Sequence, residues 1–249
     1  MPDKEGRVIK RVISTGRVTL VFFCLVMFFM LAGATSAYLR FALGDDGLHY
    51  YHLRTIIEQF DLDGENNLPN YYQSVSMLFC AWLLLVISDM KKKIKDRYLG
   101  HWRFLAVVFL FLSMDESAQL HEMIIEPLRD ALHTSGAFYF AWVIPGLIFV
   151  TIMGLAYLPF VWKLPSRTKW LFILAGMIYL NGALGLEMVG GYLMKIYGKD
   201  SSQYVIETIA EESLEMLGIL IFINALMGYL NGFVEYVIIG FDERITAEK

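Results

Sequence analysis

The amino-acid sequence predicts an all-α protein, a polytopic integral membrane bundle of six transmembrane helices with both termini in the cytoplasm. Of its 249 residues, 57% are apolar and 18% are charged, whereas soluble domains average roughly 45–50% apolar and 25% charged residues. Six apolar segments are long enough to cross a bilayer, which takes about 20 residues. Lys and Arg gather at alternate segment ends, as the positive-inside rule describes.

The first seventeen residues form a basic tail, and the apolar run from about residue 18 to residue 39 is the first predicted transmembrane helix. A cleaved signal peptide is the alternative, because Ala34-Thr-Ser-Ala37 has the small residues of a cleavage site. The apolar run is longer than the roughly 7–15 residues of a signal-peptide core, which favours an uncleaved helix.

Residues 40–70 form the longest polar connection. Apolar residues recur in it at mixed spacings of three and four, which predicts a short amphipathic helix on the membrane surface; they are Leu48, Tyr51, Leu53, Ile56, Ile57 and Phe60. Asp61, Asp63 and Glu65 alternate as in a calcium loop. Because the Gly and Glu of such a loop are missing at the sixth and twelfth positions, we expect a solvated turn instead.

The remaining apolar segments predict five more crossings, at about residues 71–89, 104–122 or slightly beyond, 137–161 with a kink at Pro145, 170–194 and 204–230. The segment 233–241 is too short to cross and is expected at the interface. The chain is therefore expected to comprise a tail (1–17), one membrane domain (18–230) and a second tail (231–249).

The distribution of basic residues predicts the orientation. The two tails and the connections 91–103 and 162–169 hold 16 Lys and Arg, whereas the three opposite connections hold 5. This asymmetry places both termini in the cytoplasm and residues 40–70 outside. We expect a multi-pass protein of the plasma membrane, the inner membrane of a bacterium. Because the basic residues lie at segment ends, a nucleic-acid partner is not expected.

Acidic residues inside three of the apolar segments are the main clue to function. They lie in Ser113–Glu122, at Glu187 and in Glu207–Glu215, and none of these three predicted helices contains Lys or Arg. An ionised acid at a helix centre costs roughly 2.5–3.5 kcal/mol on the insertion scale. Compensation must therefore come from bound cations, shared protons or a water-filled cleft.

Depth and helical phase predict that these acids meet. At about 1.5 Å per residue, they all lie at the midplane or in the outer half of the membrane. Asp115, Gln119 and Glu122 share one helix face, while His121 points about 120° away from Asp115. Close packing at Gly182, Gly185, Gly190 and Gly191 would bring Glu187 near the other two helices. The predicted metal site comprises Asp115, Glu116, His121, Glu122, Glu187, Glu211, Glu212 and Glu215.

Carboxylates with one imidazole suit a divalent iron, manganese or zinc ion. In residue types, the set is similar to the ligands of di-metal carboxylate bundles. The spacing departs from that pattern, because Glu116 and His121 are five residues apart and Glu212-x-x-Glu215 has Glu where the motif has His.

The sequence therefore favours a divalent-metal-dependent membrane enzyme, an oxidoreductase or a hydrolase, that acts on a lipid or another lipophilic substrate from the outer leaflet. A proton- or cation-coupled transporter using the same acids is the alternative, and an accessory membrane subunit is a third class. A transporter needs polar residues through the cytoplasmic half, where the first two helices offer only Thr19, Ser76 and Ser88.

Overall fold

The computed structural model describes residues 14–47, 51–64 and 66–232, and this part of the chain contains helices and turns but no strand. Five of its helices are long and apolar enough to cross a membrane, or six if one bent pair is counted as a single span. The predicted all-helical fold is thus confirmed, and the number of long apolar helices is compatible with a multi-pass membrane protein.

Four spans are single helices: α1 (Thr15–Gly47), α3 (Leu68–Lys93), α6 (Val143–Lys163) and α9 (Ser202–Asn231). A fifth, composite span joins α7 (Ser166–Leu180), the π-helix η3 (Asn181–Leu186) and α8 (Glu187–Tyr197). The bent pair begins with α4 (Leu99–Ala118) and continues through the short η1 (Glu122–Ile124) and α5 (Ile125–Leu132). The short α2 (Tyr51–Gln59) and η2 (Gly136–Phe138) lie in connections.

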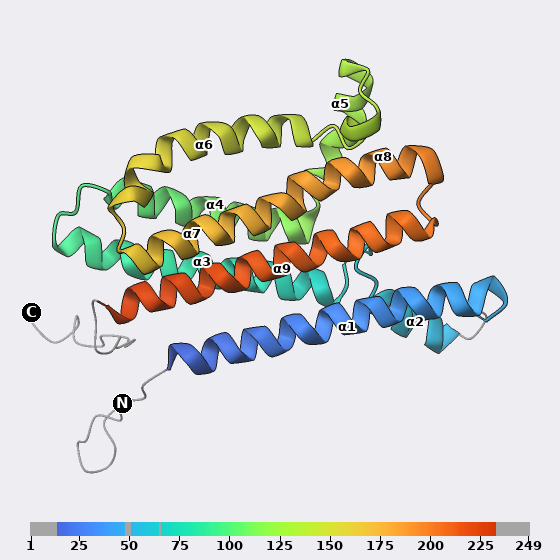
Figure 1. Cartoon of the computed structure of the whole chain (residues 1–249), viewed down its shortest axis with the longest axis horizontal. Helices are drawn as coiled ribbons and strands as arrows, with labels where there is room; N and C mark the ends of the chain where they lie inside the picture. Colours follow the sequence, from blue (N-terminus) through green and yellow to red (C-terminus); the bar gives the residue numbers. More distant parts are fainter. Residues whose placement is uncertain (1–13, 48–50, 65, 233–249) are drawn as a thin grey trace, which may run out of the picture.

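The spans run side by side with alternating direction (Figure 1). Helix α9 contacts α1, α3, α7, η3 and α8, and so forms the centre of the bundle. The α3–α4 and α6–α7 connections lie at one end, which we name the basic end; the α8–α9 connection lies at the opposite end, which we name the acidic end (Figure 1). Large apolar side chains on α6 are exposed, as a lipid-facing helix requires; examples are Ile152, Leu155 and Leu158.

Helix α4 begins and ends earlier than the predicted 104–122 helix, because the chain leaves the helix after Ala118. Gln119 adopts a left-handed conformation with φ 53°, and the chain bends by 73° into the following helical pair. The Asp115 side chain accepts a hydrogen bond from the backbone N–H of His121 at 2.8 Å. Such a local side-chain bond competes with the helical ladder, so the expected common helix face of Asp115, Gln119 and Glu122 is wrong.

One further boundary differs from expectation. Helix α6 begins at Val143, so Pro145 lies in its first turn, where a missing N–H costs nothing, and does not kink the helix. The short helix expected around residues 48–60 is present as α2, and its place on the membrane surface stays a prediction. Asp61 and Asp63 lie in the turn that follows it. The segment 233–241 and Glu65 lie outside the described residues.

An apolar core fills the half of the bundle nearest the basic end. Trp102 and Phe160 are each 1% exposed, and their rings meet edge to face at 4.9 Å. Phe109 of α4 stacks on Phe222 of α9 at 4.7 Å. A second apolar cluster packs α1 against α9 and the α2–α3 connection. Beside it, toward the acidic end, polar side chains such as Gln73, Glu207 and Glu215 are buried in the bundle.

Gly218→Ala should destabilise the protein, because a Cβ there would lie 2.8 Å from the Tyr179 backbone nitrogen and 2.9 Å from its Cα. Overpacking of this kind costs about 1–3 kcal/mol. Gly228→Ala on the same helix meets nothing within 4 Å, and it should be neutral or gain up to about 1 kcal/mol of helix propensity. Melting temperatures in detergent compare the two variants. Equal melting temperatures would contradict the close approach of α7 and α9.

Candidate functional site

Glu187 is positioned by the π-helix η3, which ends immediately before it. One-turn π segments inside α-helices are frequent at functional sites. Gly182 of this segment lies so close to α9 that a Cβ there would be 2.9 Å from the Glu211 carbonyl oxygen. Glycine therefore permits the approach that brings Glu187 beside the acids of α9.

A chain of contacts links the α4 bend to Glu187. The Nδ1 atom of His121 lies 2.9 Å from Oδ2 of Asp115. The imidazole packs against Trp142, with ring centroids 4.8 Å apart. The Trp142 indole N–H donates to Oε1 of Glu187 at 2.7 Å. Asp115 thus fixes the His121 ring, and Trp142 fixes Glu187 next to it.

Two amides of α3 donate hydrogen bonds to two of the acids, of which Glu116 is half-buried and Glu215 is buried. The Asn70 amide donates to Oε1 of Glu116 at 3.1 Å, and the Gln73 amide donates to Oε2 of Glu215 at 2.9 Å. Gln73 is 1% exposed and Glu215 is 9% exposed. The remaining amide oxygens of Asn70 and Gln73 are buried and have no hydrogen-bond partner within the described residues.

Helix α9 carries three acids along the face that meets α8 and η3. The carboxyl groups of Glu211 and Glu187 interact directly, and Glu215 lies within electrostatic range of both Glu116 and Glu187. Glu207, nearest the acidic end, is 7% exposed and lies against Gly190. Neither of its oxygens makes a hydrogen bond of ordinary geometry in the described part of the chain.

Ion pairs join the connections that cover the acidic end. Lys199 donates to Asp63 at 2.9 Å, and the Tyr204 hydroxyl donates to the same carboxylate at 3.1 Å. Arg40 binds Asp61 at 2.8 Å. Burial raises the pKa of Asp63 above its ordinary value, although the bonds from Lys199 and Tyr204 favour its charged form. These pairs tie the α2–α3 connection to the end of α1 and to the α8–α9 connection.

The structure brings several of the predicted residues together. Asp115 and His121 form a pair, Glu187 and Glu211 form another, and Glu116 lies within electrostatic range of Glu215. Glu122 is exposed beyond the α4 bend and interacts with Glu187 only over distance, and Glu212 is half-buried beside Glu211. No group of three or more His, Cys, Asp or Glu side chains in the described ranges is arranged to hold a metal ion.

The expected direction of His121 was wrong. An unbroken helix would point it about 120° away from Asp115, but the bend after Ala118 folds the imidazole back onto that carboxylate. The reason is local, because Asp115 binds both the backbone N–H and the ring of His121.

Asn70, Gln73 and Trp142 were not among the predicted site residues. A signal existed for Gln73, since an amide inside an apolar segment needs a buried partner. Asn70 follows Pro69 at the start of α3 and looks like an ordinary residue of a first turn. Nothing in the sequence singles out Trp142, because its contact with Glu187 depends on how α6 and α8 pack.

Residues 18–230 match a family model described as "Domain of unknown function (DUF8692)". Neither the curated proteins nor the solved structures contain a match to the chain.

Gln73→Leu should destabilise the protein, because Glu215 loses the amide that donates to it inside the bundle. Loss of one partner of a buried polar pair costs about 1–3 kcal/mol. Ser76→Ala is the matched control, since Ser76 is as buried as Gln73 but bonds to Tyr72 of its own helix and not to one of the acids. Thermal unfolding in detergent should show a lower midpoint for Gln73→Leu; equal midpoints would mean that the Gln73–Glu215 contact does not stabilise the fold.

Proposed function

Because the chain belongs to the family described as "Domain of unknown function (DUF8692)", a description that names no activity, we propose a function from the acidic site itself. The protein is a divalent-metal-dependent membrane enzyme, an oxidoreductase or a hydrolase, that acts on a lipid or another lipophilic substrate. Its site lies in the half of the bundle nearest the acidic end.

The observation that carries this proposal is an excess of buried oxygen acceptors over donors. Both carboxylate oxygens of Glu207 and the amide oxygens of Asn70 and Gln73 are buried without a hydrogen-bond partner in the described residues. Glu211 and Glu215 stand close to them with no basic residue in α9. An electron-rich site shielded from water is stabilised by a cation, and carboxylate and carbonyl oxygens are the ligands of hard divalent ions.

The Asp115–His121 pair supports a metal role for the imidazole. In protein metal sites, the ligating histidine commonly bonds through its other nitrogen to a carboxylate, which fixes the tautomer and the ring orientation. Asp115 holds Nδ1 of His121, which leaves Nε2 as the second nitrogen for an ion. Glu187, held by Trp142, is the nearest candidate to complete such a set with Glu211.

A bound iron, manganese or zinc ion would supply Lewis acidity or, for iron and manganese, redox chemistry. His121, Glu187, Glu211, Glu116 and Glu215 are the side chains that would hold it, with Glu122 and Glu212 at the margin. Asn70, Gln73 and Trp142 orient these acids by hydrogen bonds. Asp115 would orient His121 and would not itself bind the ion.

The apolar core favours an enzyme over a transporter. Beyond Glu215, α9 continues toward the basic end with Ile219, Phe222 and Ile223, each no more than 7% exposed. The first polar contact beyond them is that between Thr19 and Asn224, at 3.4 Å. A transport path would have to cross this packed layer, whereas a site open toward one leaflet would not.

We propose the orientation from the distribution of charge. The basic connections gather at the end where α1 begins and α9 ends, and the positive-inside rule assigns that end to the cytoplasm. This gives six crossings, with the bent α4–α5 pair as one of them, and both termini inside. The acidic site then faces the outer leaflet, from which a lipophilic substrate would enter.

Metal content tests the proposed function. Protein purified in detergent without chelators should contain about one or two divalent ions per chain, as di-metal bundles do, and Glu116→Ala and Glu211→Ala should each bring this close to background. Glu58→Ala should retain the metal, because Glu58 lies on α2 and pairs with Arg54. Elemental analysis measures the result. Equal metal in all three variants, or none in the native protein, would leave the proton-coupled transporter as the better proposal.

Labelling of single cysteines tests the orientation. In a background lacking Cys24 and Cys80, Glu58→Cys should react with an impermeant maleimide from outside intact cells, and Lys93→Cys only after permeabilisation. Both positions are exposed in the structure, so burial does not limit the reaction. The reverse pattern would overturn the proposed orientation and move the acidic site to the inner leaflet.

A further inference from the structure

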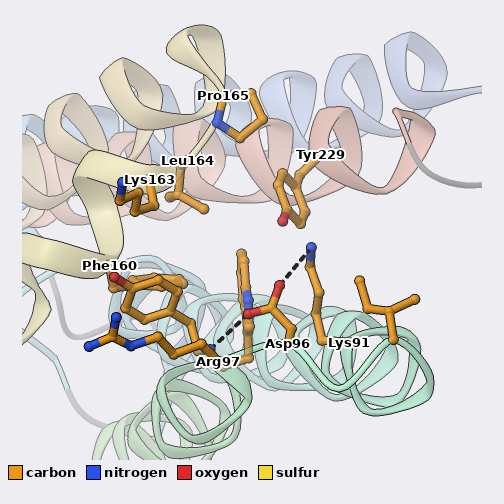
Figure 2. A pocket seen from close by; sticks show the side chains of 11 residues that line it. Lys91, Asp96, Arg97, Phe160, Lys163, Leu164, Pro165 and Tyr229 are labelled. Carbon is orange, nitrogen blue, oxygen red and sulfur yellow. Dashed lines mark hydrogen bonds and ion pairs between the residues drawn. The ribbon is translucent and has the colours of Figure 1, made fainter.

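A second candidate site lies at the basic end, away from the acidic one. It is a cavity of about 500 Å³ between the α3–α4 connection, the α6–α7 connection and the end of α9. Figure 2 shows Arg97 and Lys163 at one side of this cavity and Lys91 with Tyr229 at the other. Three elements far apart in sequence thus contribute to one pocket.

The charge of the cavity is positive. Its lining contains three cations and one carboxylate. The carboxylate, Asp96, already lies 3.2 Å from Nζ of Lys91 and accepts the Tyr98 backbone N–H at 2.7 Å. The ion pairs of the described residues include neither Arg97 nor Lys163, and both side chains are exposed. These two side chains therefore give the cavity its unbalanced charge.

The rest of the lining is apolar and rigid. Trp102 and Phe160 are almost fully buried, and Leu164 and Pro165 close the side formed by the α6–α7 connection. The cavity lies at the ends of α3, α6 and α9, which are long and apolar enough to cross a membrane. This combination matches a group with an anionic head and an apolar body at the depth of the bilayer surface.

We propose that this cavity binds a phosphate group, that of an anionic phospholipid headgroup. Arg97 offers a planar guanidinium that can bind two phosphate oxygens, and Lys163 offers a second cation across from Lys91. Basic pockets between transmembrane helices are typical sites for anionic headgroups. The aromatic and aliphatic walls fit the glycerol and the first acyl carbons, which free inorganic phosphate lacks. The proposed site does not depend on the acidic site or on its metal.

Native mass spectrometry of the full-length protein in detergent tests this inference. The probes are phosphatidylglycerol and phosphatidylcholine with identical acyl chains, each with and without millimolar inorganic phosphate. The wild type should retain phosphatidylglycerol in preference to phosphatidylcholine. The double variant Arg97→Gln/Lys163→Gln should weaken this retention by roughly tenfold or more, since each basic side chain near an anionic group contributes a factor of about five.

The control removes the same charge outside the cavity. Lys92 and Lys93 lie in the last turn of α3, and both are exposed and absent from the lining. The variant Lys92→Gln/Lys93→Gln should therefore bind phosphatidylglycerol as the wild type does. Equal losses in both double variants, or no preference for phosphatidylglycerol, would overturn the proposal. If inorganic phosphate displaces the lipid at equal concentration, the lipid assignment is wrong and the ligand is the free anion. If the double variant aggregates, Lys163→Gln alone, at an exposed position of the lining, should still weaken the retention of phosphatidylglycerol, by a smaller factor.

Discussion

The close approach of the composite span to α9 is the constraint on which the acidic site depends. Gly182, Gly190 and Gly218 each occupy a position where a Cβ would fall within 2.9 Å of atoms across the contact. Dispersion and backbone proximity hold helices together in lipid, where the hydrophobic effect between them is absent. Because these glycines let the backbones meet, Glu187 stands beside Glu211 and Glu215, which no isolated helix could arrange.

Because these acids share a low-dielectric space, the structure must provide polar groups around them. A carboxylate in an apolar medium needs hydrogen-bond donors. Helix α3 supplies the amides of Asn70 and Gln73, and the residue before α6 supplies the indole N–H of Trp142. These donors are too few for the acceptors. Within the described residues, the amide oxygens of Asn70 and Gln73 and both carboxylate oxygens of Glu207 have no hydrogen-bond partner. The remaining imbalance is what a bound cation or a set of shared protons would remove.

The membrane class, the helical architecture and the approximate spans follow from the sequence, because apolar length is a property of each segment alone. The sequence also identifies candidate site residues at Glu187, Glu211 and Glu215, because an acid in an apolar helix without a basic partner is costly wherever that helix packs. The sequence did not predict the bend after Ala118, which arises from hydrogen bonds between Asp115 and His121. The roles of Gln73 and Trp142 depend on inter-helix contacts, which periodicity within one segment does not contain. Whether any of these residues binds a metal remains a proposal.

The two ends of the bundle carry opposite excess charge. At the acidic end, carboxylates gather where the described residues offer amide and indole donors but few cations, so the compensating charge has to come from outside the protein. At the basic end, Asp96 pairs with only one of the three cations in the cavity, and an anionic headgroup, as we propose, would balance the other two. Between them, Phe109 stacks on Phe222 in the apolar core, and the Trp102–Phe160 pair forms part of the wall of the basic cavity. This packed layer separates the acidic site from the basic cavity, so the cation and the headgroup that we propose for them would bind independently of each other.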